Sequence, residues 1–418
     1  MTKILAIRAR QILDSRGTPT IECSLKTEDG VFKSSVPSGK STGAHEAKEL
    51  RDGGKKYFGM GVLKAIDNIN TTIAKKLIGK HPANQEQIDE IMRELDGTED
   101  KHKLGANAIL AVSVASCKAG AASQKIPLYQ HIANLAHNKT LTIPVPAFNI
   151  INGGAHAGNK LNIQEHMIMP TKAKTFSEAM EIGAEIYHAL KKRLEHDLGA
   201  ASTNVGDEGG FAPQMNCAFD AFDAIMDTAL SLKYQNKIEL AIDAAATTFF
   251  KGKHYNFEGK ELNSEQLSQI YADLCAQYPL KSIEDPFHEE AFKDFANLRK
   301  KLNIQIVGDD LLCTNTKRIR KAIDNNSCNC LLLKINQIGT ITEALNAAKL
   351  AKRYDWNIMI SHRSGETNDS FIADFAVGIG AGQIKAGAPA RGERLTKYNR
   401  LLEIEKETGL PYAKPKLS

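Results

Sequence analysis

Residues 280–310, LKSIEDPFHEEAFKDFANLRKKLNIQIVGDD, contain two short strand-like runs that each end on an acid. The first run, SIE, ends at Glu284, and the second, QIVGD, ends at Asp309. The residues between them, 289–302, have the periodicity of an amphipathic helix. This segment therefore predicts a strand, a helix and a second strand.

The same unit recurs through the second half of the chain. Four further strand-like runs end on a residue that can bind a cation or move a proton: ELAID at Asp243, LLLK at Lys334, IMISH at His362 and GQIK at Lys385. From Glu284 onward, these end residues lie 25, 25, 28 and 23 residues apart, with a helix-like stretch in each gap. The spacing is typical of a β/α barrel, in which every strand points its carboxyl end at one face. We therefore expect three carboxylates, two lysines and a histidine to share one pocket.

The chain is too long for a barrel alone. A barrel accounts for roughly 250 residues, so 418 residues predict a second domain. The first 36 residues predict a three-stranded antiparallel meander, and helical patterns follow at 62–78 and 105–124. Prolines at 144 and 146 break the helical pattern, which places the boundary near Asn138. We expect an α+β domain at 1–138 and the barrel at 139–418. The predicted barrel helices span 175–196, 218–232, 264–277, 289–302, 316–325, 340–353 and 393–406.

Composition narrows the class of protein. Hydrophobic residues make up 42% and charged residues 25%, which is ordinary for a folded globular chain. No run of about 18 apolar residues predicts a membrane helix, and the first residues alternate apolar and basic types, unlike an export signal. Seven scattered cysteines without a CxxC pair favour a reduced, cytoplasmic setting. The net charge of +5 contains no lysine or arginine block, which disfavours nucleic-acid binding.

Three acids at neighbouring strand ends suggest a metal site. Asp243, Glu284 and Asp309 offer hard oxygen ligands facing one pocket, as Mg²⁺ prefers. The alternative is that each acid caps the helix that follows it. Lys334 closes an apolar strand, and burial together with a nearby metal would favour its neutral form, so it is a candidate general base. The alternative is a lysine that pairs with one of the acids.

Further candidates lie in loops. Lys385 could hold a substrate carboxylate, and the segment 361–366, SHRSGE, offers an arginine beside a hydroxyl, which suits a phosphate group. Glycine-flanked segments carry His156 and Glu208, and Glu165 follows in QEHMIMP. Ordinary turns and solvated loops are the alternatives. The GKST at 39–42 matches only the tail of a nucleotide-binding loop, because serine stands at 34 where that loop needs glycine.

These residues sit in motifs that resemble the enolase family from residue 3 to about 405. The matching segments, in order, are DSRGTPT, VPSGKSTGAHEAKELRDG, GANAILAVS, NIINGGAHAGN, QEHMIMP, VGDEGGFAP, SIEDPF, VGDDL, LLLKINQIGT, SHRSGET and GQIKAGAPARGERLTKYNRLLEIE. The resemblance implies an α/β fold, with an enolase-type barrel preceded by a smaller α+β domain. It also implies reversible dehydration of 2-phosphoglycerate to phosphoenolpyruvate, through an enediolate stabilised by one or two Mg²⁺ ions, as the superfamily is known to use.

The resemblance assigns a role to each matching residue. Lys334 would be the base, Glu208 the acid, and Glu165, His156 and His362 would assist at the leaving hydroxyl. Arg363, Ser364, Lys385, Gln164, His156 and Glu165 would bind substrate. Asp243, Glu284 and Asp309 would bind the first Mg²⁺, and Ser41 would reach a second ion that arrives with substrate. Lys40 stands where the family usually has alanine.

The resemblance also implies partners. The family is usually dimeric, with octamers known, and Arg16 matches a position at the dimer interface. A different reaction of the same superfamily, on a carboxylate without phosphate, is an alternative that SHRS disfavours. A binding role is a second alternative. The chain would then bind an RNA-processing partner, or bind a surface receptor through the terminal KPKLS, with secondary presence at the cell surface.

Overall fold

The strand-like runs of the second half form one nine-stranded sheet in the computed structural model, which describes residues 2–40 and 42–417. The order of strands is β4-β15-β14-β13-β12-β11-β7-β6-β5. Their bounds are β4 (Val145–Pro146), β5 (Phe148–Asn152), β6 (Glu165–Met169), β7 (Glu239–Asp243), β11 (Leu280–Glu284), β12 (Gln305–Gly308), β13 (Cys330–Leu333), β14 (Asn357–Ser361) and β15 (Gly382–Lys385). Because only Ala147 separates β4 at one edge of this sheet from β5 at the other, the sheet curls into a nearly closed barrel. The predicted barrel is confirmed.

Helices surround this barrel. They are α6 (Phe176–Leu198), α7 (Ala218–Ser231), α8 (Ser264–Gln277), α9 (Phe292–Lys301), α10 (Thr316–Asn325), α11 (Ile335–Ile338), α12 (Ile341–Arg353), α13 (Phe371–Ile379) and α14 (Gly392–Thr408). The seven predicted helices are confirmed to within a few residues. Helix α13 was not predicted, because it is buried on nearly every side and shows no polar stripe. A small sheet of β8 (Phe250–Lys251), β9 (His254–Phe257) and β10 (Lys260–Leu262) was also not predicted.

Strand β6 runs against its neighbours, which corrects the expectation that every strand points its carboxyl end at one face. It pairs antiparallel with both β5 and β7, whereas the strands from β7 through β15 pair in parallel. The connection from β5 to β6 holds no α-helix, so it cannot make the crossover that a parallel pair needs. The first residue of β6, Glu165, therefore lies beside Asp243, the last residue of β7.

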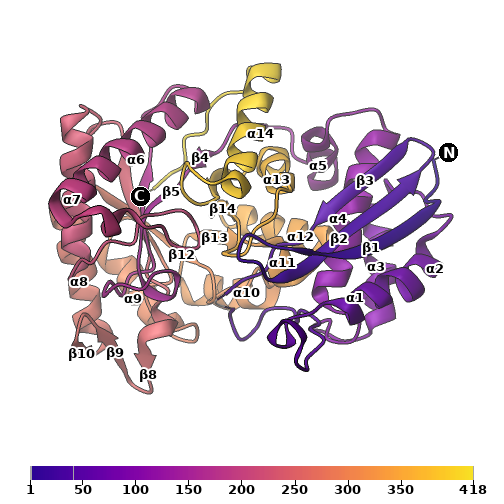
Figure 1. Ribbon diagram of the computed structural model, residues 1–418, viewed down its shortest axis with the longest axis horizontal. Helices are drawn as coiled ribbons and strands as arrows, with labels where there is room; N and C mark the ends of the chain where they lie inside the picture. The colour runs from indigo at the N-terminus through magenta and orange to yellow at the C-terminus, as the bar shows by residue number, and fades with distance from the viewer. Residues whose placement is uncertain (1, 41, 418) are drawn as a thin grey trace.

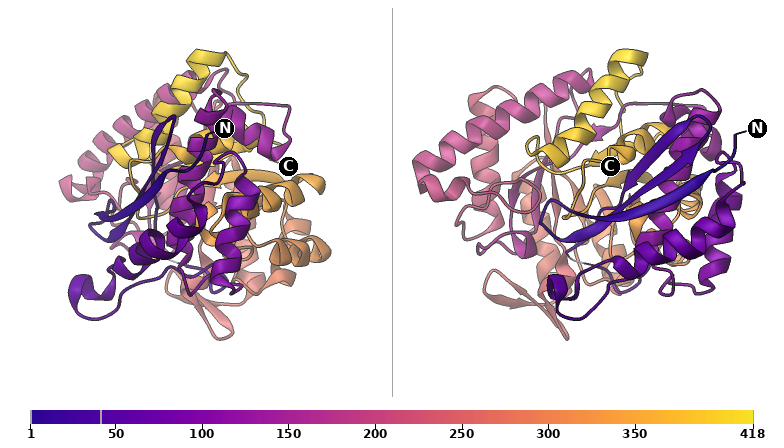
Figure 2. Two further views of the ribbon diagram at one scale, coloured as in Figure 1. Left: turned by 90° about the vertical axis from the view of Figure 1, so that its right-hand side faces the viewer. Right: turned by 45° about the vertical axis from the view of Figure 1, so that its right-hand side comes forward.

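The N-terminal residues form the predicted meander of β1 (Ala6–Leu13), β2 (Pro19–Thr27) and β3 (Gly30–Ser35), and all its pairings are antiparallel. Helix α4 (Ala106–Ser123) packs on β2 and β3. The other helices are α1 (Leu63–Asp67), α2 (Ala74–Leu77), α3 (Gln85–Asp96) and α5 (Leu128–Ala136). A π-helical turn joins α1 to α2, and the predicted apolar stripe from Val62 to Leu77 is buried. These elements gather on one side of the barrel (Figures 1 and 2), where α5 packs against α13.

Helix α4 is long and apolar enough to cross a membrane by length and composition, although no such segment was expected from the sequence. Its 18-residue window has a mean hydropathy of 1.2, and 83% of it is buried inside the protein. It is rich in alanine, serine and glycine, and these small side chains let it pack closely against the meander. The burial identifies it as a core helix of the N-terminal domain.

His166 on β6 links stability to pH. Its ring is fully buried, makes an edge-to-face contact with Phe222, and is held by the carbonyl of Ile151 at 3.4 Å from Nδ1. Burial lowers the pKa of His166 to about 4. Since the unfolded histidine titrates near pH 6.5, the folded state binds fewer protons, and the free energy of unfolding falls as pH drops from about 6.5 to about 4. Over this pH range we expect the free energy of unfolding of His166→Phe to fall by about 3 kcal/mol less than that of the parent protein.

Denaturant unfolding of both proteins between pH 7 and 4 measures this difference. The control variant is His196→Gln, which removes a histidine whose side chain is 87% exposed instead of buried. Equal pH slopes for the parent and His166→Phe would contradict the assignment.

Candidate active site

Six of the predicted residues lie together at the carboxyl ends of the barrel strands. Asp243, Glu284 and Lys385 are the last residues of β7, β11 and β15, and Asp309, Lys334 and His362 directly follow β12, β13 and β14. Five of the six are buried, and the side chain of Lys334 is only 13% exposed. The neighbouring strands are in register, so Glu284 lies beside Asp243 and Ser361 beside Lys385. The strand spacing therefore predicted this convergence correctly.

Lys385 holds the centre of the pocket. Its Nζ lies 2.8 Å from both carboxylate oxygens of Glu284, and 3.2 Å from Asp243 Oδ2 and from Glu165 Oε1. Burial lowers the pKa of Lys385, but the surrounding carboxylates outweigh it and raise that pKa well above its usual value. Burial and the Asp243 charge raise the pKa of Glu284. A single ammonium therefore contacts three acidic side chains that converge on one point.

Lys334 forms a close ion pair with Asp309, 2.5 Å from Nζ to Oδ2. Burial lowers the pKa of Lys334, but the Asp309 carboxylate outweighs it and the pKa is raised. Burial acts in the expected direction, and the ion pair with Asp309 is the alternative that the sequence left open. Asp309 compensates the buried charge, which neither strand reveals on its own. Gln337 Nε2 donates to the other oxygen, Asp309 Oδ1, at 2.8 Å, so both oxygens are held.

The predicted metal ligands fit a divalent cation by their chemistry. Asp243 and Glu284 surround one positive charge, the Lys385 ammonium, which shows that their oxygens can converge on a cation. Asp309 pairs with the other ammonium of the pocket, that of Lys334. Two other groups of acidic or histidine side chains have ligand atoms within 4.8 Å of one another: His156 with Glu165 and Glu208, and Asp285 with Asp309 and Asp310. Ser41, the predicted ligand of a second ion, lies outside the described residues.

Glu208 lies in the same pocket, close to several side chains that can donate hydrogen bonds. Asn149 Nδ2 donates to Glu208 Oε2 at 3.0 Å, His156 Nδ1 lies 3.5 Å from Oε1, and His362 Nε2 lies 3.6 Å from Oε2. Arg394 Nη1 lies 2.6 Å from His362 Nδ1. Because a guanidinium can only donate, Nδ1 accepts, and the neutral imidazole carries its proton on Nε2, facing Glu208. Burial lowers the pKa of His362 to about 4, so the ring is neutral at pH 7.

Glu165 and Glu208 form a carboxyl pair. Burial and the neighbouring Glu208 raise the pKa of Glu165 well above its usual value. Burial also raises the pKa of Glu208, but His156, His362 and Arg394 outweigh it, and the net shift is downward. The surroundings thus favour the neutral form of Glu165 and the charged form of Glu208.

Arg363 and Ser364 line the same pocket as Lys334 and Lys385, as do His156, Gln164, Glu165 and Glu208. The Arg363 guanidinium donates to both carboxylate oxygens of Glu46, at 2.9 and 3.1 Å. Ser364 Oγ accepts the backbone N–H of Lys40 at 2.7 Å. Gln164 Nε2 donates to Asp243 Oδ2 at 3.2 Å, so it orients a predicted metal ligand.

Several residues that hold the site were missed by sequence reasoning. They are Glu46, Asn149, Gln337 and Arg394, which contact Arg363, Glu208, Asp309 and His362 respectively. Glu46 lies inside the VPSGKSTGAHEAKELRDG motif, so the resemblance pointed at its segment. None of the four follows a barrel strand end, and strand spacing could not have found them.

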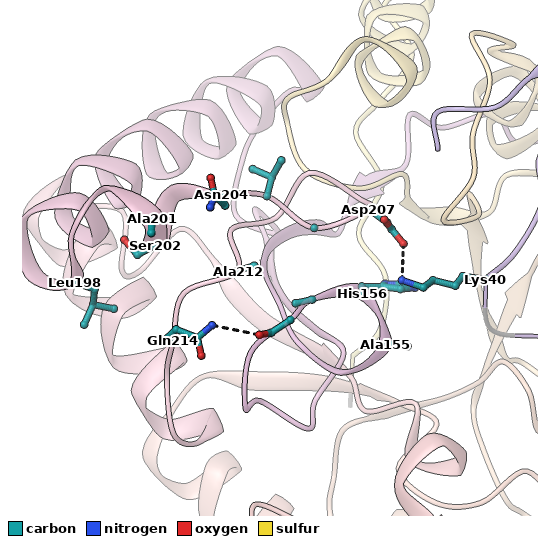
Figure 3. A pocket seen from close by; sticks show the side chains of 14 residues that line it. Lys40, Ala155, His156, Leu198, Ala201, Ser202, Asn204, Asp207, Ala212 and Gln214 are labelled. Carbon is teal, nitrogen blue, oxygen red and sulfur yellow. Dashed lines mark hydrogen bonds and ion pairs between the residues drawn. The ribbon is translucent and has the colours of Figure 1, made fainter. Parts of the chain in front are cut away.

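A wider cavity of about 690 Å³ lies beside this pocket and shares His156 with it. Figure 3 shows Lys40 and Asp207 directed toward each other on its wall, with Nζ 3.2 Å from Oδ2. Leu198, Asn204 and Gln214 line its far side. None of the predicted metal ligands among the described residues lines this wider cavity, which we interpret as the approach to the buried pocket.

Comparisons with known proteins agree with this geometry. A family model described as "Enolase, C-terminal TIM barrel domain" matches residues 140–413, and one described as "Enolase, N-terminal domain" matches residues 4–132. A protein of Solanum lycopersicum named "Enolase" is 51% identical, and the alignment covers 98% of this chain and 96% of that relative.

Proposed function

The chain belongs to the enolase family, and from this premise we propose how its side chains carry out the family's reaction. The enzyme is a carbon–oxygen lyase that converts 2-phosphoglycerate reversibly to phosphoenolpyruvate. One observation supports the residue assignment most strongly: Lys334 and Lys385 lie among carboxylates on one wall, with the Glu165–Glu208 pair in the same pocket. A base and an acid can thus reach one substrate from two sides.

The family uses Mg²⁺, and we propose that Asp243, Glu284 and Asp309 hold a first ion. We propose further that a second ion arrives with substrate and is reached by Ser41. When bound, Mg²⁺ supplies positive charge beside the substrate carboxylate, on which negative charge accumulates as the α-carbon loses its proton. Lys385 adds a fixed ammonium at the same place.

Lys334 is proposed to take that proton from the α-carbon. To do so it must first be neutral, and its raised pKa originates in the Asp309 charge. If Asp309 held a cation, its charge would be neutralised and the pKa of Lys334 would fall, so a residue that would hold the ion would also favour the neutral base. The close Lys334–Asp309 contact would make cation binding at Asp309 and loss of the Lys334 proton depend on each other.

Glu208 is proposed to protonate the departing hydroxyl. The surroundings favour the neutral form of Glu165, and transfer of its proton to Glu208 would give Glu208 the proton that an acid needs. His156 and the Nε2–H of His362 lie close enough to orient Glu208 and the leaving group. Arg363 and Ser364 are proposed to bind the phosphate and Gln164 to contact substrate, since all three line the pocket.

The proposed roles predict that removal of the α-proton and departure of the hydroxyl can be separated by mutation. Purified protein should form phosphoenolpyruvate from 2-phosphoglycerate only with Mg²⁺, followed by ultraviolet absorbance. We expect Glu208→Gln to lower kcat by about 10²–10⁴-fold, because the leaving hydroxyl loses its acid. Exchange of the α-proton with deuterated solvent should continue in this variant, because Lys334 is intact.

The neighbouring Asp207, an acid on the wall of the wider cavity, supplies the control. Asp207→Asn should retain kcat within about fivefold. Loss of both dehydration and proton exchange in Glu208→Gln would remove Glu208 from the acid role. A wild-type protein without turnover of 2-phosphoglycerate would contradict the function itself.

Further properties are proposed from family membership. We propose a homodimer, with an octamer as the alternative assembly, a cytoplasmic location, and a domain division at residue 138. In this structure Arg16 contacts Asp14, Ser364 and Ser38 of its own chain, and its role at an interface stays a prediction. Receptor binding through KPKLS and an RNA-processing partner likewise stay predictions.

A further inference from the structure

Glu46 joins the N-terminal domain to the pocket wall of the barrel. Its two carboxylate oxygens accept from Nη1 and Nη2 of Arg363 at 2.9 and 3.1 Å, which is a two-pronged ion pair. Both side chains are buried, 8% exposed for Glu46 and 3% for Arg363. The same Arg363 Nη1 also donates to Asn336 Oδ1 at 3.0 Å. Acceptors from two segments distant along the chain therefore help to fix the plane of the guanidinium.

The segment around Glu46 also contacts Gln337, which binds Asp309. Glu46 Oε1 accepts the backbone N–H of Gly43 at 3.0 Å, and the backbone N–H of Ala47 donates to the carbonyl of Gln337 at 2.8 Å. Gln337 Nε2 in turn donates to Asp309 Oδ1, the carboxylate that pairs with Lys334. A short segment of the N-terminal domain thus supports both Arg363 and Asp309.

We propose that Glu46 is a positioning residue, which orients the Arg363 guanidinium for the substrate phosphate. The inference rests on the proposed function, in which Arg363 binds that phosphate. A guanidinium binds phosphate best when its planar fork is held in place beforehand, because less rotational freedom is then lost on binding. Glu46 does not touch the reacting atoms, and it acts through Arg363.

Glu46→Gln tests this proposal because the two possible roles of the carboxylate predict changes of KM in opposite directions. If Glu46 orients Arg363, loss of its charge should raise KM for 2-phosphoglycerate about tenfold or more, with a smaller change in kcat. If Glu46 merely competes with the phosphate for Arg363, the same substitution should lower KM. An unchanged or lowered KM would therefore overturn the proposal.

Asp89 provides a matched control. It is also a buried carboxylate of the N-terminal domain that bonds to the barrel, accepting from the backbone N–H and Oγ of Thr342 at 2.9 and 2.6 Å. Asp89→Asn should lower the unfolding temperature without raising KM. An equal rise of KM in Asp89→Asn would show that any loosening between the domains weakens binding, and would also overturn the proposal. Glu46→Asp, which keeps the charge, should recover part of the lost affinity.

A crystal structure of Glu46→Gln gives a measurement that does not depend on turnover. We expect the Arg363 guanidinium to move away from Asn336 Oδ1, and an unchanged Arg363 would contradict the inference. Wild-type turnover tests the proposed function separately, so an inactive wild type and an unmoved Arg363 are distinct failures.

Discussion

Lys334→Ala should lower kcat for dehydration of 2-phosphoglycerate by about 10²–10⁴-fold, the range that a positioned base contributes. Unlike Glu208→Gln, it should also stop exchange of the substrate α-proton with deuterated solvent, because the group that removes this proton is gone. Mg²⁺ affinity should not fall, since the substitution takes away a competing ammonium from Asp309. Absorbance of phosphoenolpyruvate and mass spectrometry of recovered substrate measure the two effects.

A matched control is Lys101, a lysine that is 2% exposed and paired with Glu343 at 3.0 Å. Lys101→Ala removes a buried ion pair of the same kind that does not line the pocket, and kcat should stay within about twofold of wild type. Continued α-proton exchange in Lys334→Ala would assign the base role to another residue.

Glu284→Gln should weaken Mg²⁺ binding at least about 100-fold, because it removes a charged oxygen ligand from the proposed first metal site. Activity at a fixed Mg²⁺ concentration should fall together with this affinity. The activity of the wild type should likewise fall when a chelator removes Mg²⁺. Titration of the unfolding temperature with Mg²⁺ measures affinity without turnover, since an ion that binds only the folded state stabilises it.

The control for this substitution is Asp374, a carboxylate that is 2% exposed and bound by Arg400 Nε and Nη2, both at 2.9 Å. Asp374→Asn loses a buried charge on α13, away from the strand ends, and should keep the Mg²⁺ dependence of wild type. If Glu284→Gln kept that dependence as well, Glu284 would not be a metal ligand.

Much of the site was readable from local pattern. The runs ending at Asp243, Glu284 and Asp309 each predict a strand from their own residues. Parallel strands in a barrel must bring their ends together. The helices between them were predicted because an amphipathic helix carries its periodicity within a dozen residues. Helix α13 escaped prediction because a helix buried nearly all round shows no such periodicity.

The electrostatic state of the site was not readable in this way. The charged state of Lys334 depends on Asp309, which follows a different strand, and the protonation of Glu165 depends on Glu208, which lies in a loop. Glu46 and Arg363 lie 317 residues apart. A pKa shift requires a distance between two atoms, and strand spacing predicts which face a residue reaches but not which charge it meets.

The amino-acid sequence alone determined the barrel, the N-terminal meander and the set of acids and lysines at the strand ends, because each of these depends on patterns within a few consecutive residues. Only the tertiary structure decided the reversed direction of β6, the partner of each buried charge and the support of Arg363 by Glu46. These features depend on close contacts between segments distant along the chain, and such contacts exist only once the chain has folded.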